Sequence, residues 1–164
     1  MKAPATYQEV QAIRRQVNQA HGDEYDRLSA NAALYWGFKT PTSIRGRIHC
    51  YHFQEEDVTI CEFAKRARAV VTIGKSPNGK FTNSIDVTYS EGGYCGPCSI
   101  WGEEYSSRDQ ALAGGIEHVV DHLDRTIKWY NNRSANKVAE LKKMRRQTLK
   151  FPVNAYQLDF LELL

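Results

Sequence analysis

The sequence predicts an α+β protein with an antiparallel sheet of three to five strands and a long helix packed on one face. Three observations carry this prediction. Residues 81–89 alternate between apolar and polar side chains, as a strand with one buried face does. Residues 107–127 carry an apolar stripe at helical spacing. Residues 7–36 hold two further helical patterns ahead of any strand.

The N-terminal third is predicted to form helices first and a strand later. In residues 7–20 apolar side chains recur three and four positions apart, and residues 24–36 repeat this pattern until Gly37 ends it. A strand is expected over residues 44–53, followed by a polar turn at residues 54–57.

The middle of the chain predicts a hairpin and a third strand. Residues 58–66 resemble the first helix of a helix-turn-helix, but no recognition helix follows, because residues 67–74 are β-prone. Asn78-Gly79 is a hairpin signal between residues 67–74 and 81–89. A glycine-rich turn then precedes a short third strand, expected over residues 97–103.

The C-terminal part predicts two helices. Ser107 and Gln110 have the spacing of a capping box, so the long helix should begin behind Ser107. Gly114 and Gly115 disfavour this helix by about 1 kcal/mol each, so they indicate close packing against the sheet. After a break at residues 131–134, a basic helix is predicted over residues 135–149.

Positive charge is concentrated in residues 125–150. This stretch carries nine Lys and Arg side chains against one acid, Glu140, so its net charge is +8. The whole chain carries +3, which leaves −5 for the remainder. A positive block on an otherwise acidic protein indicates an anionic partner, such as nucleic acid or a nucleoprotein complex.

The short helix behind the break is the element predicted to bind. It is expected to be an appendage of a mildly acidic body, touching phosphates without reading sequence. Trp129 and Tyr130 precede it and could either stack on bases or pack on the core. The residues predicted to bind the anionic partner are Arg133, Lys137, Lys142, Lys143, Arg145, Arg146 and Lys150.

Two cysteines form the motif Cys95-Gly96-Pro97-Cys98, which is identical to the active-site segment of thioredoxins. Thiol chemistry would need Cys95 at a helix N-terminus, whereas the residues after Cys98 predict a strand. The pair could instead supply two zinc ligands, with partners from His49, Cys50, His52 or Cys61. A zinc-stabilised or thiol-active protein is therefore the alternative function.

Two histidines, His118 and His122, lie one turn apart on the long helix. The sequence lacks the Glu directly after the first His that zinc proteases require, so a polar helix edge is the preferred interpretation. No nucleophile elbow, phosphate-binding loop or dinucleotide fingerprint is present, and no catalytic residue is predicted. The sequence thus favours a binding protein over an enzyme.

Two resemblances add expectations. The order of elements in residues 67–124 resembles the β-β-β-α double-stranded-RNA-binding domain and HicB-type antitoxin domains, although the lysine cluster of the former is missing at Ser106 to Gln110. Residues 99–111, with Tyr105-Ser106-Ser107-Arg108-Asp109, resemble a segment of small accessory proteins of phages and plasmids. This resemblance implies a mobile-element protein, and an anti-CRISPR or other anti-defence inhibitor is one concrete form of it.

The chain is expected to form one domain over residues 1–152, with the basic helix at residues 134–150. The apolar tail, residues 153–164, could join two copies into a homodimer. No run of about 20 apolar residues and no signal-peptide pattern is present, which predicts a cytoplasmic protein without a membrane contact.

Overall fold

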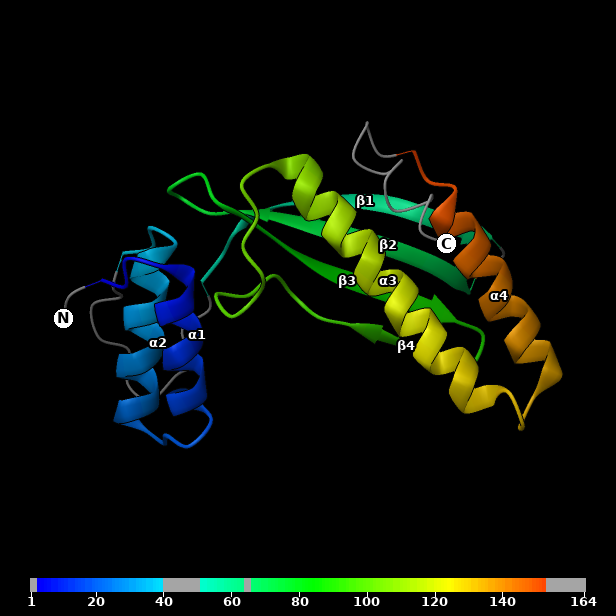
Figure 1. The fold of residues 1–164 in the computed structure, drawn as a ribbon, viewed down its shortest axis with the longest axis horizontal. Helices are drawn as coiled ribbons and strands as arrows, with labels where there is room; N and C mark the ends of the chain where they lie inside the picture. The colour runs from blue at the N-terminus through cyan, green and yellow to red at the C-terminus, as the bar shows by residue number, and fades with distance from the viewer. Residues whose placement is uncertain (1–2, 40–50, 64–65, 153–164) are drawn as a thin grey trace.

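The structure is a computed structural model that describes residues 3–39, 51–63 and 66–152. The four strands form one antiparallel sheet in the order β1-β2-β3-β4, which confirms the α+β class (Figure 1). The elements are α1 (Tyr7–Val17), α2 (Asp23–Tyr35), β1 (Gln54–Phe63), β2 (Ala67–Lys75), β3 (Phe81–Tyr89), β4 (Gly92–Cys95), α3 (Arg108–Tyr130) and α4 (Ala135–Leu149).

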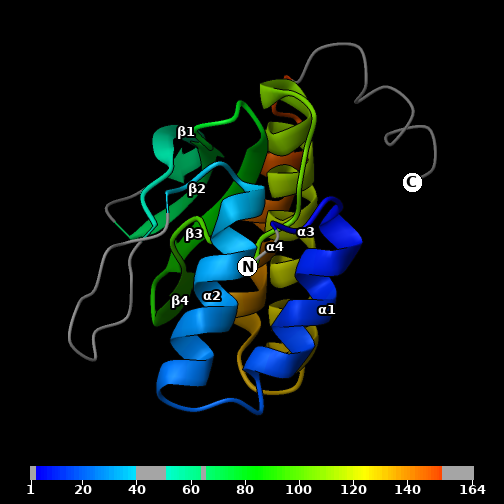
Figure 2. The same ribbon diagram turned by 90° about the vertical axis from the view of Figure 1, so that its left-hand side faces the viewer.

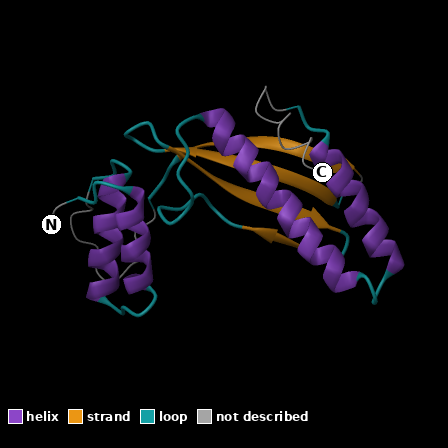
Figure 3. Ribbon diagram, viewed as in Figure 1, coloured by secondary structure: helices purple, strands orange, loops and turns teal. Residues whose placement is uncertain are grey.

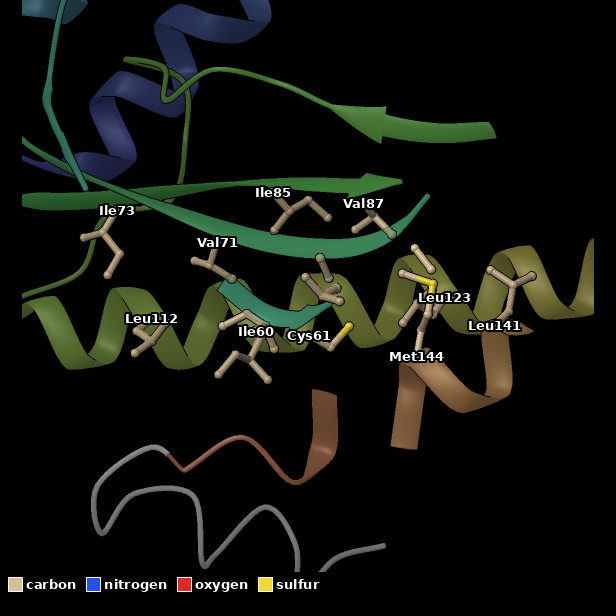
Figure 4. Close-up of a cluster of buried hydrophobic side chains, with 14 of the residues drawn as sticks. Ile60, Cys61, Val71, Ile73, Ile85, Val87, Leu112, Leu123, Leu141 and Met144 are labelled. Atoms are coloured by element: carbon tan, nitrogen blue, oxygen red, sulfur yellow. The ribbon is translucent and has the colours of Figure 1, made fainter. Parts of the chain in front are cut away.

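Helices α3 and α4 lie on one face of the sheet, and the α1–α2 pair lies beyond one end of it (Figures 1 and 3). The strand residues that face α3 are apolar at every second position. In the central strands, Val71 is paired with Val58 on one side and Ile85 on the other. These side chains pack against Leu112 and Leu123 of α3 (Figure 4). The apolar residues that alternate along the strands and those that recur at helical spacing in α3 thus pack together in one core.

Two adjacent glycines bring α3 close to the sheet. A Cβ atom on Gly115 would overlap the side chain of Val71, and one on Gly114 would overlap the ring of Tyr105. Both glycines are buried within α3. The predicted close packing is confirmed, and it explains why helix-disfavouring residues stand in the middle of the longest helix.

Helix α4 belongs to the same core, so its description as an appendage is wrong. Leu141 and Met144 are fully buried, and Val138 is nearly so. The Thr148 hydroxyl is also buried and donates to the carbonyl oxygen of Met144 at 3.0 Å. Three to four positions separate these residues, so one face of α4 packs on α3 and on the β1–β2 side of the sheet.

The α1–α2 pair is held by the segment between β4 and α3 (Figure 2). The Trp36 indole nitrogen donates to the carbonyl oxygen of Ile100 at 2.9 Å, and the Tyr7 hydroxyl donates to that of Gly102 at 2.9 Å. Trp36 is fully buried, against Phe53. This second apolar cluster joins the N-terminal helices to the sheet domain.

Two predictions for strands and turns are wrong. Residues 54–57, expected as a turn, form the first part of β1, because Val58 and Cys61 further along this strand pair with the apolar β2. The same strand includes residues 58–63, for which the sequence had argued against a helix-turn-helix. The strand that follows the β2–β3 hairpin is β4 (Gly92–Cys95), and residues 97–103, predicted to form that strand, do not form one. The carbonyl oxygens of that segment accept hydrogen bonds from α1 and α2 instead of a strand. The strand expected over 44–53 lies mainly outside the described residues, and 51–53 are not in a strand.

The glycine packing predicts that Gly115→Ala destabilises the protein by about 1–2 kcal/mol. Overpacking costs roughly 1–3 kcal/mol, and the higher helix propensity of Ala offsets part of that cost. Denaturant unfolding would measure the change. Gly96→Ala is a matched control, because its Cβ would meet only the Tyr94 hydroxyl at an ordinary 3.6 Å. Equal stability of the two variants would contradict the close approach.

Candidate functional site

Two of the seven predicted binding cations, Lys137 and Arg145, form ion pairs within the protein, and Arg133 packs on an aromatic ring. Arg145 donates through two nitrogens to the Asp124 carboxylate of α3, at 2.6 and 3.2 Å. Lys137 forms an ion pair with Glu91. The Arg133 guanidinium lies 4.0 Å from the ring centroid of Trp129. Arg145 and Lys137 thus fasten α4 to α3 and to the β3–β4 turn, whereas Arg133 holds the turn before α4 against the end of α3.

The other four cations form what we name the basic stripe: Lys142, Lys143, Arg146 and Lys150. All four side chains are exposed, and positions 142, 146 and 150 follow one another at helical spacing. Within the described part of the chain, none of the four has a carboxylate partner. Lys143 lies 4.3 Å from the ring centroid of Phe63.

The one acid of the block does not neutralise the stripe. The Glu140 carboxylate accepts a hydrogen bond from the Ser90 hydroxyl at 2.6 Å and so is directed toward the β3–β4 turn. Its neighbour Lys137 is directed toward Glu91 in the same turn. Helix α4 therefore has an apolar face, a flank fastened to the protein, and an exposed flank on which every charged residue is positive.

The two cysteines of the thioredoxin-like motif lie in different environments. Cys95 is exposed at the end of β4, and no helix begins until Arg108. Cys98 is buried, its thiol donates to the carbonyl oxygen of Thr72 at 3.5 Å, and burial raises its pKa to about 11. Cys98 is thus protonated at neutral pH.

The zinc prediction receives no third ligand from the described residues. Residues 3–39, 51–63 and 66–152 contain no group of three or more His, Cys, Asp or Glu side chains arranged to hold a metal ion. His49 and Cys50 lie outside these ranges. Cys61 is buried in the main core beside Thr148. His52, the remaining residue predicted as a possible zinc ligand, is exposed.

A groove of about 870 Å³ runs along the side of α3 that faces β4. Its walls come from α1, from β3, β4 and the segment after β4, and from α3. The lining includes Arg14 of α1, residues 83–85 and 89 of β3, Tyr94 of β4, the residues Gly96, Pro97, Ser99, Trp101, Gly102 and Glu103, and the α3 residues His118, Asp121, His122, Arg125, Thr126, Trp129 and Tyr130.

The two histidines of α3 lie in this groove, not on a freely solvated helix edge. The Asn83 side-chain nitrogen donates to the carbonyl oxygen of Ala111 at 2.7 Å, which leaves its oxygen 3.2 Å from Nδ1 of His118. His118 Nδ1 is thus the donor in this pair. Nε2 of His118 lies 3.6 Å from Glu103.

The second histidine is partly buried. His122 packs against the Tyr94 ring, with centroids 5.4 Å apart. Burial, and then the nearby charge of Arg125, lower the pKa of His122. At neutral pH the imidazole of His122 is therefore uncharged and forms part of the aromatic wall.

Sequence reasoning missed the groove and one of its two exposed aromatic residues, Tyr94. Among the described residues, the large hydrophobic side chains that are exposed are Tyr94, at 53 %, and Trp129, at 56 %. Trp129 had been identified as a possible stacking residue, but Tyr94 gave no signal beyond its place before Cys95. The register of β4 on β3, which sets Tyr94 opposite Val87, cannot be read from a four-residue strand.

Comparison of the chain with protein-family models, curated proteins and solved structures found no match. Among the described residues, no helix is both long and apolar enough to cross a bilayer.

The burial of Cys98 predicts slow thiol alkylation. With a pKa near 11 in place of 9.0, the thiolate at pH 8 is about 100-fold less abundant. Peptide mapping after a pulse of iodoacetamide should therefore show Cys98 modified at least that much more slowly in the folded protein than in the same protein in urea. Exposed Cys95 is the internal control. Rapid modification of Cys98 in the folded protein would contradict its burial.

Proposed function

We propose that this protein binds nucleic acid through the basic stripe of α4. The observation that carries the proposal is the separation of roles on one helix. Arg145 and Lys137 pair with acids of the same protein, whereas Lys142, Arg146 and Lys150 face solvent without an acidic partner among the described residues. A row of unpaired cations at helical spacing can follow a phosphate backbone.

The chemistry of the stripe favours contact with phosphates over base reading. Three of its four members are lysines, which are point charges on flexible stems and do not form the planar fork that arginine offers. Phosphate contacts position a nucleic acid without specifying its sequence. Binding through the stripe is therefore proposed to be sequence-tolerant and strongly dependent on salt.

A mobile-element origin belongs to the same proposal and is supported by residues 99–111 alone. The resemblance implies a target in a host nucleoprotein complex, with an anti-CRISPR or other anti-defence inhibitor as one concrete form. In the structure, the residues that carry it have structural tasks. Ser107 caps α3, and Arg108 donates to Glu56 at 2.8 Å, a bond that holds the pKa of the Glu56 carboxyl below its usual value.

Neutralising the stripe is expected to abolish most of the salt-dependent affinity. If all four cations touch phosphates, replacing them with Ala should reduce the slope of log K against log salt by roughly 3.6 for duplex DNA, or about 0.9 for each contact. This slope would be measured by fluorescence anisotropy with a labelled DNA duplex of 20-nucleotide strands at several salt concentrations. The variant is K142A/K143A/R146A/K150A.

A charge-matched control separates the stripe from net charge. The variant R15A/R27A/K39A/K75A removes four exposed cations outside α4 and lowers the net charge equally. It should keep the wild-type slope. If both variants lose the same slope, binding follows overall charge and the proposed interface is wrong.

Capture from a host lysate, with and without nuclease, tests the class of partner. The proposal expects capture of nucleic acid that is lost after nuclease treatment and lost in the stripe variant. A protein partner that persists after nuclease treatment, and still requires the stripe, would overturn nucleic acid as the ligand in favour of an acidic protein surface.

A further inference from the structure

The groove beside α3 is separate from the basic stripe. It lies on the β4 side of α3, whereas α4 packs on the β1–β2 side. We infer that this groove takes single-stranded nucleic acid, whose bases stack on Tyr94 and Trp129. The inference rests on the proposed function and narrows its substrate class from nucleic acid in general to unpaired strands.

The first argument is the exposure of two flat aromatic side chains in one groove. Two exposed rings in one groove offer a ligand flat apolar faces, and aromatic rings are the usual platforms for unpaired bases. Tyr94 and Trp129 come from different elements, β4 and the last turn of α3, and both line the groove. They are also the exposed large hydrophobic residues of the described ranges.

The second argument is that both rings are held in place. Tyr94 packs against His122, whose pKa is lowered, so that the pair is an uncharged stack at neutral pH. Trp129 meets Tyr130 edge to face, with centroids 4.5 Å apart. A ring that is already positioned loses little conformational entropy when a base stacks on it.

The third argument is the placement of cations at the groove. Arg14 donates to the carbonyl oxygen of Trp101 at 3.1 Å, and Arg125 donates to that of Asp121 at 3.3 Å. Neither pairs with a carboxylate among the described residues. Phosphates of a bound strand would meet Arg14 and Arg125 while its bases contact the rings. The Arg133 guanidinium lies 4.0 Å from the Trp129 centroid, so a base would stack on the other face of that ring.

The groove is nevertheless not a strongly positive channel. Glu103 and Asp121 also line it, and their charges balance those of Arg14 and Arg125. Stacking must therefore supply more of the affinity here than charge does. This makes the groove distinguishable from the stripe, because stacking is far less sensitive to salt than phosphate contact is.

The shape of the groove favours an unpaired strand over a duplex. The α3 wall between His118 and Trp129 is about 16 Å long, at 1.5 Å per residue. Bases inside a duplex are stacked on each other and present only their edges, so they cannot cover Tyr94 or Trp129. Unpaired bases expose the flat faces that these rings need.

The test compares a labelled 20-nucleotide single strand with the matching duplex at high salt, where phosphate contacts are weakened. Wild-type protein is expected to bind the single strand at least about 10-fold more tightly. Tyr94→Ala and Trp129→Ala should each lower the single-strand affinity by roughly 5- to 150-fold and leave the duplex affinity unchanged. Tyr94→Phe and Trp129→Phe should retain it, because they keep a ring. Circular dichroism verifies that each variant is folded.

The outcomes separate this inference from the proposed function. The stripe variant is compared with wild type at low salt, where phosphate contacts are strong. If the alanine variants bind both probes like wild type at high salt while the stripe variant loses affinity at low salt, the groove inference is wrong and the stripe stands. If the alanine variants lose single-strand binding at high salt while the stripe variant keeps its affinity at low salt, the groove stands and the α4 interface is wrong. If wild-type protein binds neither probe, both are wrong.

Discussion

The close approach of α3 to the sheet is the constraint on which the rest of the structure depends. Gly115 leaves room for the Val71 side chain, and Gly114 leaves room for the Tyr105 ring, so α3 can lie close to the sheet. The hydrophobic core fills the space between the sheet, α3 and α4. The groove lies on the side of α3 that faces β4.

The segment between β4 and α3 forms part of the groove wall and connects it to the N-terminal helices. Its backbone carbonyls accept hydrogen bonds from Tyr7, Arg14 and Trp36, and so are withheld from any strand partner. An ion pair between Lys80 and Glu104, at 2.6 Å, fastens the same segment to the β2–β3 hairpin. The α1–α2 pair is thus a structural part of the groove wall, since it contributes Arg14.

The sequence correctly predicted the features that depend on interactions between residues close together in the chain. The amphipathic stripe of α3, the Ser107 cap, the break before Ser134 and the alternation of β3 are all confirmed, because each depends on neighbours within a few residues. The strand predicted over residues 97–103 was wrong for a different reason. Residues 97–103 look β-prone, but side chains more than sixty positions away satisfy their backbone.

The candidate sites were predictable only in part, for the same reason. The positive block was evident from composition, yet which cations remained free depended on Asp124 and Glu91, whose positions opposite α4 follow from tertiary packing. The groove gathers side chains from α1, β3, β4 and α3, and no single stretch of sequence carries its signal. Histidines assigned to a solvated helix edge lie instead against Asn83 and Tyr94.

Folding alone does not account for the charge of the basic stripe. The buried residues Leu141 and Met144 stabilise α4 by roughly 1.5–3 kcal/mol each, and Arg145 fastens it to α3. Like charges four positions apart on a helix instead cost about 0.2–0.5 kcal/mol per pair, which the negative end of the helix dipole reduces only partly. Neutral side chains at positions 142 and 146 would therefore serve the fold equally well. The charge of this exposed flank of α4 is thus more than the fold needs, and this excess is the physical basis of the proposal that the stripe binds an anionic partner.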